Sequence, residues 1–214
     1  MIYWLYERLL LSGISTLPAG ICFMLTGEDL LDAPGKLQEC TSWCIEISES
    51  VSSRTSETQG NGTSSLIRSL TYHISTPDPE RIDPFIPEIR KISGIAHLTL
   101  HHRENILSGG TGMDVTVAIG KSGREEIAGC IRQMAIDGIS PSDVTEEKIE
   151  SYLTFKHTPD LVIKTGGYHL TDFLIWQSVY SEIFFSDVNW RLLRKVDLLR
   201  ALRDYQARIR RFGR

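Results

Sequence analysis

The sequence lacks the long apolar runs and the paired cysteine motifs that mark several large classes of protein. No stretch approaches the ~20 consecutive apolar residues that a transmembrane helix requires, and no two cysteines form a Cys-x-x-Cys pair. Basic residues are not in excess either, because 23 lysines and arginines face 27 acidic residues and leave a net charge of −4. These absences exclude a membrane span and a Cys-x-x-Cys metal site, and they argue against nucleic acid as a general partner.

The composition of the chain fits a single α/β domain. With 214 residues and 41% hydrophobic content, it can bury one substantial core, and we expect one domain over residues 1–214. The amino-terminal MIYWLYERLLL is too short for a membrane span and carries Glu7 and Arg8, so it predicts an amphipathic docking helix rather than a signal peptide. We therefore expect a cytoplasmic protein. Core packing is the expected role of the cysteines, which are Cys22, Cys40, Cys44 and Cys130.

Strand and helix patterns alternate along the chain. This order predicts a mostly parallel central sheet flanked by helices, with ligands near the carboxyl ends of the strands. The polar segment 48–65, rich in Ser, Thr and Gly, predicts a mobile loop. His101 and His102 are expected at a solvated strand end. Strands are predicted at 20–25, 66–74, 96–101, 114–119 and 161–163, and helices at 2–11, 36–49, 82–91, 124–137 and 173–185.

The segment 159–190 is predicted to join a buried strand, a phosphate-type turn and an amphipathic helix without a break. The turn reads Lys164-Thr165-Gly166-Gly167. Paired glycines let backbone N–H groups approach an anion closely, and the lysine adds a point charge. The turn is therefore a candidate anion site, although many strand-Gly-Gly turns are connections only.

The amino-acid sequence of this segment resembles that of a known family. PDLVIKTGG and LIWQSVYSEIFFSDVNW are similar to PDLLIRTSG and LLWQSAYSELYFTDVLW, the carboxyl-terminal signature of the cis-prenyltransferases, or undecaprenyl diphosphate synthase family. The likeness extends over residues 111–127, TGMDVTVAIGKSGREEI, and 197–213. It implies an undecaprenyl diphosphate synthase-like fold and the use of isopentenyl and allylic diphosphates with Mg²⁺. Lys164, Thr165, Gly166 and Arg124 then become candidate diphosphate-binding residues, although Arg124 could equally cap the helix that it begins.

The sequence departs from the family where the family's chemistry is located. Thr26 occupies the position of the aspartate that helps to hold magnesium, and a neutral hydroxyl is a poor ligand for a hard dication. The loop at 75–81 lacks the family's asparagine and tryptophan and carries two prolines. Lys164 replaces an arginine that would bind diphosphate through two hydrogen bonds.

Retained and lost motifs together resemble the non-catalytic subunit of heteromeric cis-prenyltransferases, the Nogo-B receptor type. That resemblance implies no catalytic residue in this chain, and a catalytic partner subunit that holds Mg²⁺ and makes long polyprenyl diphosphates for glycosyl carrier lipids. It further implies that Arg211 and Gly213 of the terminal Arg-x-Gly complete the partner's isopentenyl diphosphate site. Peripheral association with a membrane would follow from the lipid product.

Two alternatives remain at this point. Glu182 aligns with a second magnesium-associated carboxylate of the family and is a weak metal candidate. Together with Glu28 or Asp29 it would give a homodimeric enzyme with a displaced metal site. The other alternative is a lipid-binding or scaffold protein that keeps the fold without the chemistry.

Overall fold

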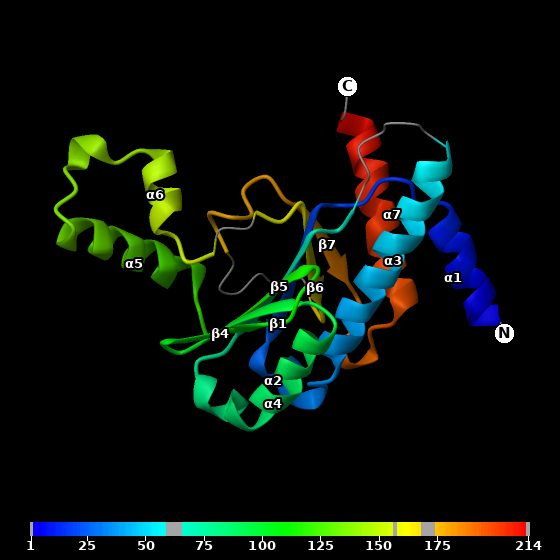
Figure 1. Cartoon of the computed structure of the whole chain (residues 1–214), viewed down its shortest axis with the longest axis horizontal. Helices are drawn as coiled ribbons and strands as arrows, with labels where there is room; N and C mark the ends of the chain where they lie inside the picture. The colour runs from blue at the N-terminus through cyan, green and yellow to red at the C-terminus, as the bar shows by residue number, and fades with distance from the viewer. Residues whose placement is uncertain (1, 59–65, 156–157, 168–173, 213–214) are drawn as a thin grey trace.

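A seven-stranded sheet forms the centre of the molecule (Figure 1). The computed structural model describes residues 2–58, 66–155, 158–167 and 174–212. The strand order is β4-β3-β5-β2-β1-β6-β7, and all neighbours are parallel except β3 and β4. The predicted α/β fold with a mostly parallel sheet is thus confirmed. The strands are β1 Gly20–Thr26, β2 Ser69–Ser75, β3 His97–His102, β4 Asn105–Gly109, β5 Asp114–Ile119, β6 Leu161–Thr165 and β7 Glu182–Ser186.

Helices cover the two faces of the sheet unequally. Figure 1 shows α1, α3 and α7 side by side at one end of the molecule, whereas α5 and α6 stand apart from them at the other end. The α-helices are α1 Ile2–Ser12, α2 Gly27–Asp32, α3 Lys36–Thr58, α4 Ile86–Arg90, α5 Gly123–Ile136, α6 Glu146–Tyr152 and α7 Lys195–Phe212. The 3₁₀ helices are η1 Pro79–Phe85, η2 Lys91–Gly94, η3 Pro141–Asp143 and η4 Trp190–Leu192.

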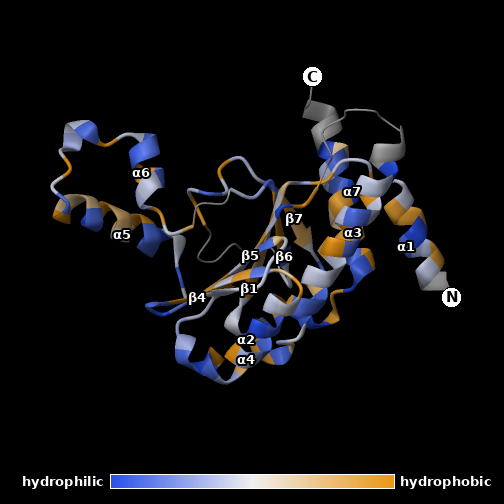
Figure 2. Ribbon diagram, viewed as in Figure 1, coloured by the Kyte–Doolittle hydropathy of each residue, from blue (hydrophilic) through white to orange (hydrophobic). Residues whose placement is uncertain are grey.

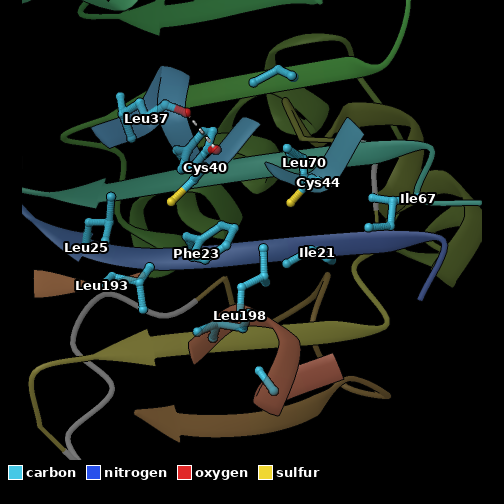
Figure 3. Packing of buried hydrophobic residues seen from close by; sticks show 14 of the residues in the cluster. Ile21, Phe23, Leu25, Leu37, Cys40, Cys44, Ile67, Leu70, Leu193 and Leu198 are labelled. Carbon is cyan, nitrogen blue, oxygen red and sulfur yellow. Dashed lines mark hydrogen bonds between the residues drawn. The ribbon is translucent and has the colours of Figure 1, made fainter. Parts of the chain in front are cut away.

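The main hydrophobic core lies between the sheet and helices α1, α3 and α7. Figure 3 shows Phe23 of β1 among side chains from α3 and α7, including Cys40 and Leu198. The Phe23 ring stacks on Tyr72 at 5.4 Å between ring centroids and meets Trp190 edge-on at 5.9 Å. The four cysteines are buried free thiols, as predicted from their apolar surroundings.

The opposite face of the sheet is more polar. In-register strands place Thr71, Thr116 and Thr99 side by side across β2, β5 and β3. His101 lies on the same face and packs edge-on against Phe155 at 5.0 Å. The prediction of a solvated strand end is therefore wrong for His101, which is buried. Burial, assisted by the nearby charge of Lys121, lowers the pKa of His101.

Helix α3 continues to Thr58, so the loop predicted from Ser48 is wrong over residues 48–58, and residues 59–65 lie outside the described residues. Two contacts explain why a polar segment stays helical. Val51 is buried in the core, and the Arg54 guanidinium donates to the carbonyl of Leu11 at 2.9 Å. The hydroxyl of Ser53 donates to the Glu49 carbonyl one turn earlier, which satisfies the hydroxyl inside the helix.

The helix predicted at 173–185 is also wrong where the structure describes it. Residues 175–180 form a turn, and Glu182–Ser186 form strand β7 in parallel register with β6. Isoleucine and phenylalanine favour a pleated, half-buried surface. The strand also covers the edge of β6, which would otherwise expose its backbone N–H and C=O groups. The apolar run that suggested a helix is instead a turn followed by an edge strand.

Strand β4 was not predicted, because the turn before it lacks the usual hairpin residues. Arg103 and Glu104 connect β3 to β4, and Arg103 has φ of 55°, a left-handed conformation that glycine and asparagine favour. Its guanidinium forms an ion pair with Asp83 at 2.5 Å. This ion pair holds the Arg103 side chain against η1, which contains Asp83.

We expect Arg103→Gly to unfold at a higher urea concentration than Arg103→Ala. Both variants lose the ion pair with Asp83, but only alanine keeps a Cβ in the left-handed conformation, so the difference in unfolding free energy should be about 1 kcal/mol. Urea denaturation of the two variants and the parent chain measures it. An alanine variant as stable as the glycine variant would show that the turn carries no strain.

Candidate functional site

The candidate site lies at the carboxyl edge of the sheet, where β1, β2 and β6 end. Thr26 ends β1 and Thr165 ends β6, and the two strands are neighbours in register. An open cleft of about 500 Å³ lies at this edge and is lined by Asp29, Asp32, Asn189, Arg191 and Leu192. Two carboxylates and one guanidinium give the cleft a negative balance, which disfavours a diphosphate.

Thr26 serves as the amino-terminal cap of α2. Its side-chain oxygen accepts a hydrogen bond from the Asp29 backbone N–H at 3.2 Å. In return, Asp29 Oδ2 accepts from the backbone N–H of Thr26 at 2.9 Å and from its hydroxyl at 2.8 Å. This reciprocal capping box satisfies the helix start and engages the Asp29 carboxylate. The position at which the resemblance expects a metal-binding aspartate thus has a structural role.

Glu28 is engaged as well. Its carboxylate forms an exposed ion pair with Arg81 of η1 at 2.6 Å between Oε1 and the guanidinium. The Arg81 guanidinium is therefore directed toward the Glu28 carboxylate at the carboxyl edge of the sheet. The Glu28–Arg81 pair ties α2 to η1 across the ends of β1 and β2.

Lys164 and Thr165 belong to strand β6, and only Gly166 and Gly167 form the turn that was predicted to start at Lys164. The Lys164 side chain is 6% exposed, and its ammonium donates to the Thr165 carbonyl at 2.8 Å. The Thr165 hydroxyl is buried and has no hydrogen-bond partner among the described residues. Gly166 has φ of 64°, and a Cβ there would come within 3.0 Å of Asn189 Oδ1. The candidate residues are therefore adjacent, and their binding of diphosphate stays a prediction.

Arg124 does not join this group. It lies exposed in the first turn of α5, at the carboxyl end of β5. Strands β2 and β1 separate β5 from β6, and neighbouring strands are about 4.8 Å apart. The same helix turn contains Glu126, whose carboxylate accepts from the Phe155 backbone N–H at 2.9 Å and from Gln177 Nε2 at 3.0 Å. Glu126 therefore orders the chain on either side of β6.

Glu182 lies at the opposite edge of the sheet from Thr26. It pairs with Leu161 at the amino end of β6, whereas Met24 of β1 pairs with Lys164 near the carboxyl end. At about 3.3 Å per residue, Glu182 and Thr26 are separated along the strands by on the order of 15 Å. The Glu182 carboxylate instead forms an ion pair with Arg208 of α7 at 3.1 Å.

The carboxylates that the structure describes at this edge do not fit a hard dication. Within one chain, Glu28 and Asp29 cannot share a metal ion with Glu182, because they lie at opposite edges of the sheet. Where the structure describes side chains, it brings together no group of three or more His, Cys, Asp or Glu residues that could hold a metal. The alternative of a displaced metal site is therefore not formed within a single chain.

Helix α7 carries the chain away from the carboxyl edge. It begins at Lys195, after η4. The Arg208 guanidinium donates hydrogen bonds to the Glu182 carboxylate and to the carbonyl of Ile183, at the amino end of β7. Arg211 lies in the next turn of α7, its side chain falls outside those described, and Gly213 lies outside the described residues. The described part of α7 thus ends near the amino edge, away from Lys164 and Gly166 of the same chain.

Three further residues, Asp32, Asn189 and Arg191, line the cleft although no motif in the sequence indicated them. Asn189 and Arg191 follow β7, so their position at the carboxyl edge depends on a strand that was predicted as a helix. The motif Thr-x-x-Asp at residues 26–29 would have predicted the capping box.

Comparisons with known proteins agree on the family and the fold. A family model described as "Putative undecaprenyl diphosphate synthase" matches residues 85–213. An isoprenyl transferase of Thermus thermophilus is 40% identical over 159 residues, which cover 69% of this chain and 57% of the relative. A tritrans,polycis-undecaprenyl-diphosphate synthase (geranylgeranyl-diphosphate specific) of Thermoplasma volcanium is 33% identical over 207 residues, covering 87% of this chain and 80% of the relative.

Two solved structures share the fold. A probable undecaprenyl diphosphate synthase from Campylobacter jejuni superposes with a TM-score of 0.63 at 19% identity, covering 92% of this chain and 99% of the other. Lavandulyl diphosphate synthase from Lavandula x intermedia, in complex with dimethylallyl diphosphate, gives a TM-score of 0.57 at 18% identity, covering 89% and 95%. The chain spans little more than half the length of several relatives, for example 57% of the Thermus protein.

Proposed function

Because this chain belongs to the undecaprenyl diphosphate synthase family of cis-prenyltransferases, we propose that it is the non-catalytic subunit of a heteromeric enzyme. Its partner is a catalytic cis-prenyltransferase subunit that holds Mg²⁺ and condenses isopentenyl diphosphate with an allylic diphosphate. The product is a long-chain polyprenyl diphosphate for glycosyl carrier lipids, made in the cytoplasm. The chain supports this reaction through assembly and through its terminal Arg-x-Gly.

The capping box between Thr26 and Asp29 carries the proposal. A catalytic subunit needs a free carboxylate at the end of β1 to hold a dication beside the leaving diphosphate. Here the Asp29 carboxylate, in the helix turn that Thr26 caps, accepts two hydrogen bonds from Thr26 itself, and the Glu28 carboxylate is paired with Arg81. The family match also begins at residue 85, beyond both Thr26 and the 75–81 loop, two of the places in which the sequence departs from the family.

Charge at the carboxyl edge adds support. The cleft at this edge has Asp29 and Asp32 against Arg191, and Arg81 is held by Glu28. A site that binds two diphosphates and transfers an allylic group needs positive charge and a bound metal ion. The core face of the sheet, where Phe23, Tyr72 and Trp190 pack together, is filled by side chains.

We expect the purified chain alone to give no condensation above background, because its described residues form no metal site for diphosphate departure. The assay supplies Mg²⁺, geranylgeranyl or farnesyl diphosphate and labelled isopentenyl diphosphate. Co-expression with a cis-prenyltransferase subunit that retains the family's aspartate should yield a co-purifying, active heteromer. Mixing separately purified subunits then shows whether this chain raises the partner's rate.

The outcomes of this assay separate the functions that compete with the proposal. Turnover by the chain alone would favour the second candidate, a homodimeric enzyme, which the names of its relatives support because they are transferases and synthases. Failure to co-purify with any such subunit, with both chains folded, would favour a lipid-binding or scaffold protein that keeps the fold.

A further inference from the structure

The outer face of α1 exposes a patch of large apolar side chains. Trp4 is 59% exposed, and Leu5 and Leu9 are each 66% exposed. The opposite side of the helix faces the core, where Leu10 is buried. Figure 2 shows hydrophobic positions on this helix at the edge of the molecule, outside the layer of α3 and α7. A surface helix normally turns polar residues outward, so an outward apolar face indicates an interaction site.

Arginines border this patch. The Arg8 guanidinium lies over the Trp4 ring at 4.8 Å, and the Arg200 guanidinium lies over the Tyr6 ring at 5.5 Å. Arg203 approaches Gly13 at the end of α1, since a Cβ on Gly13 would lie 4.0 Å from Arg203 Nε. Arg200 also pairs with Asp197 on its own helix, but half of its side chain stays exposed. Three arginines thus lie beside the patch, against Glu7 as the acidic residue of α1, on a chain whose net charge is −4.

The combination of side chains matches the chemistry of one kind of surface. Tryptophan has an apolar ring with one polar N–H, and arginine places its charged end in water while its stem covers apolar surface. These are the residues that an interfacial helix inserts at the boundary between acyl chains and headgroups. Basic residues beside the apolar face add attraction to anionic lipids.

We propose that α1 docks in the plane of an anionic lipid bilayer, with Trp4, Leu5 and Leu9 inserted and the bordering arginines among the headgroups. The helix lies on the membrane rather than across it. None of the described helices is long and apolar enough to span a bilayer. This inference does not depend on the helper function, since the chain alone should bind lipid whether or not it is catalytic.

Vesicle flotation of the full chain tests the proposal. We expect the protein to float with vesicles of phosphatidylcholine containing about a third phosphatidylglycerol, and less with phosphatidylcholine alone. Leu5→Ser with Leu9→Ser should lower the partition coefficient at least tenfold, because two apolar side chains no longer insert. Arg200→Gln with Arg203→Gln should lower binding to the anionic vesicles roughly fivefold per charge, and added salt should reduce that difference.

Ile106→Ser with Ile131→Ser is the matched control, because these isoleucines are 62% and 58% exposed on β4 and α5. It should float like the parent chain. Circular dichroism and the thermal midpoint confirm that each variant is folded, and quenching of Trp4 by brominated lipid should disappear in Trp4→Phe. An equal loss in the control and α1 variants, or no flotation of the parent chain, overturns the proposal. If Leu5→Ser with Leu9→Ser instead dissolves a dimer in analytical ultracentrifugation without changing flotation, the patch binds a second copy and the proposal is wrong.

Discussion

Replacing Arg211 by alanine in this chain is expected to lower the turnover of its complex with a catalytic subunit by about 10²- to 10³-fold. The proposal assigns Arg211 to the diphosphate of isopentenyl diphosphate in the partner's site. A guanidinium binds a diphosphate with charge-assisted hydrogen bonds, and removing such a donor from a desolvated site typically costs ~2–5 kcal/mol. Steady-state kinetics with varied isopentenyl diphosphate measures the loss.

Arg214→Ala is the matched control, because it removes the same charge from the same tail but lies outside the Arg-x-Gly motif. It should change turnover only a few-fold. Gel filtration must show equal amounts of heteromer for both variants, so that the loss is one of catalysis and not of assembly. Near-parental rates for both complexes would mean that the tail is only a solvated helix end, and the helper mechanism would then be wrong.

Trp190→Ala is expected to destabilise the chain by about 3–5 kcal/mol, because it removes a large aromatic side chain from the centre of the core. Trp190 is 0% exposed, and its ring meets Phe23 at 5.9 Å and Tyr72 at 6.3 Å between centroids. Truncation leaves a cavity between the centre of the sheet and η4. Urea denaturation at several protein concentrations gives the change in unfolding free energy.

Trp4→Ala provides the control for this stability experiment, because the same substitution at an exposed position should change the unfolding free energy by less than about 0.5 kcal/mol. Trp190→Phe keeps an aromatic ring and removes an indole N–H that has no hydrogen-bond partner among the described residues. It should cost clearly less than alanine. If Trp190→Ala does not fold, the phenylalanine variant still tests the packing, and a loss as small as that of Trp4→Ala would contradict it.

The elements that local pattern determines were predictable from the sequence. Strand β5 runs from Asp114 to Ile119, as the alternation of its side chains predicted, and β1 begins at Gly20 as expected. The extension of α3 was not predictable from composition, because polar residues stay helical there through contacts with residues distant in sequence, such as Arg54 with Leu11. Propensity alone could not show that contact.

The candidate site was predictable in part. That Thr26 stands where the resemblance expects an aspartate could be read directly, and so could its separation of three residues from Asp29. The position of Glu182 could not, because it depends on the register in which β7 pairs with β6. A helix would have left Glu182 free to approach the carboxyl edge, whereas the strand places it beside Arg208 at the other edge.

The direction of α7 has a consequence for stoichiometry. The helix follows η4, whose residues line the cleft, and its Arg208 lies beside the amino end of β7, so its described end points away from the carboxyl ends of the strands of its own chain. In the proposed pairing, only the catalytic subunit's cleft contains metal ligands, and two chains would form a single reacting centre. Such a particle would bind one equivalent of a tight substrate analogue per two chains. The tail of the catalytic subunit would then have no reacting centre to complete, and its sequence could diverge without loss of turnover.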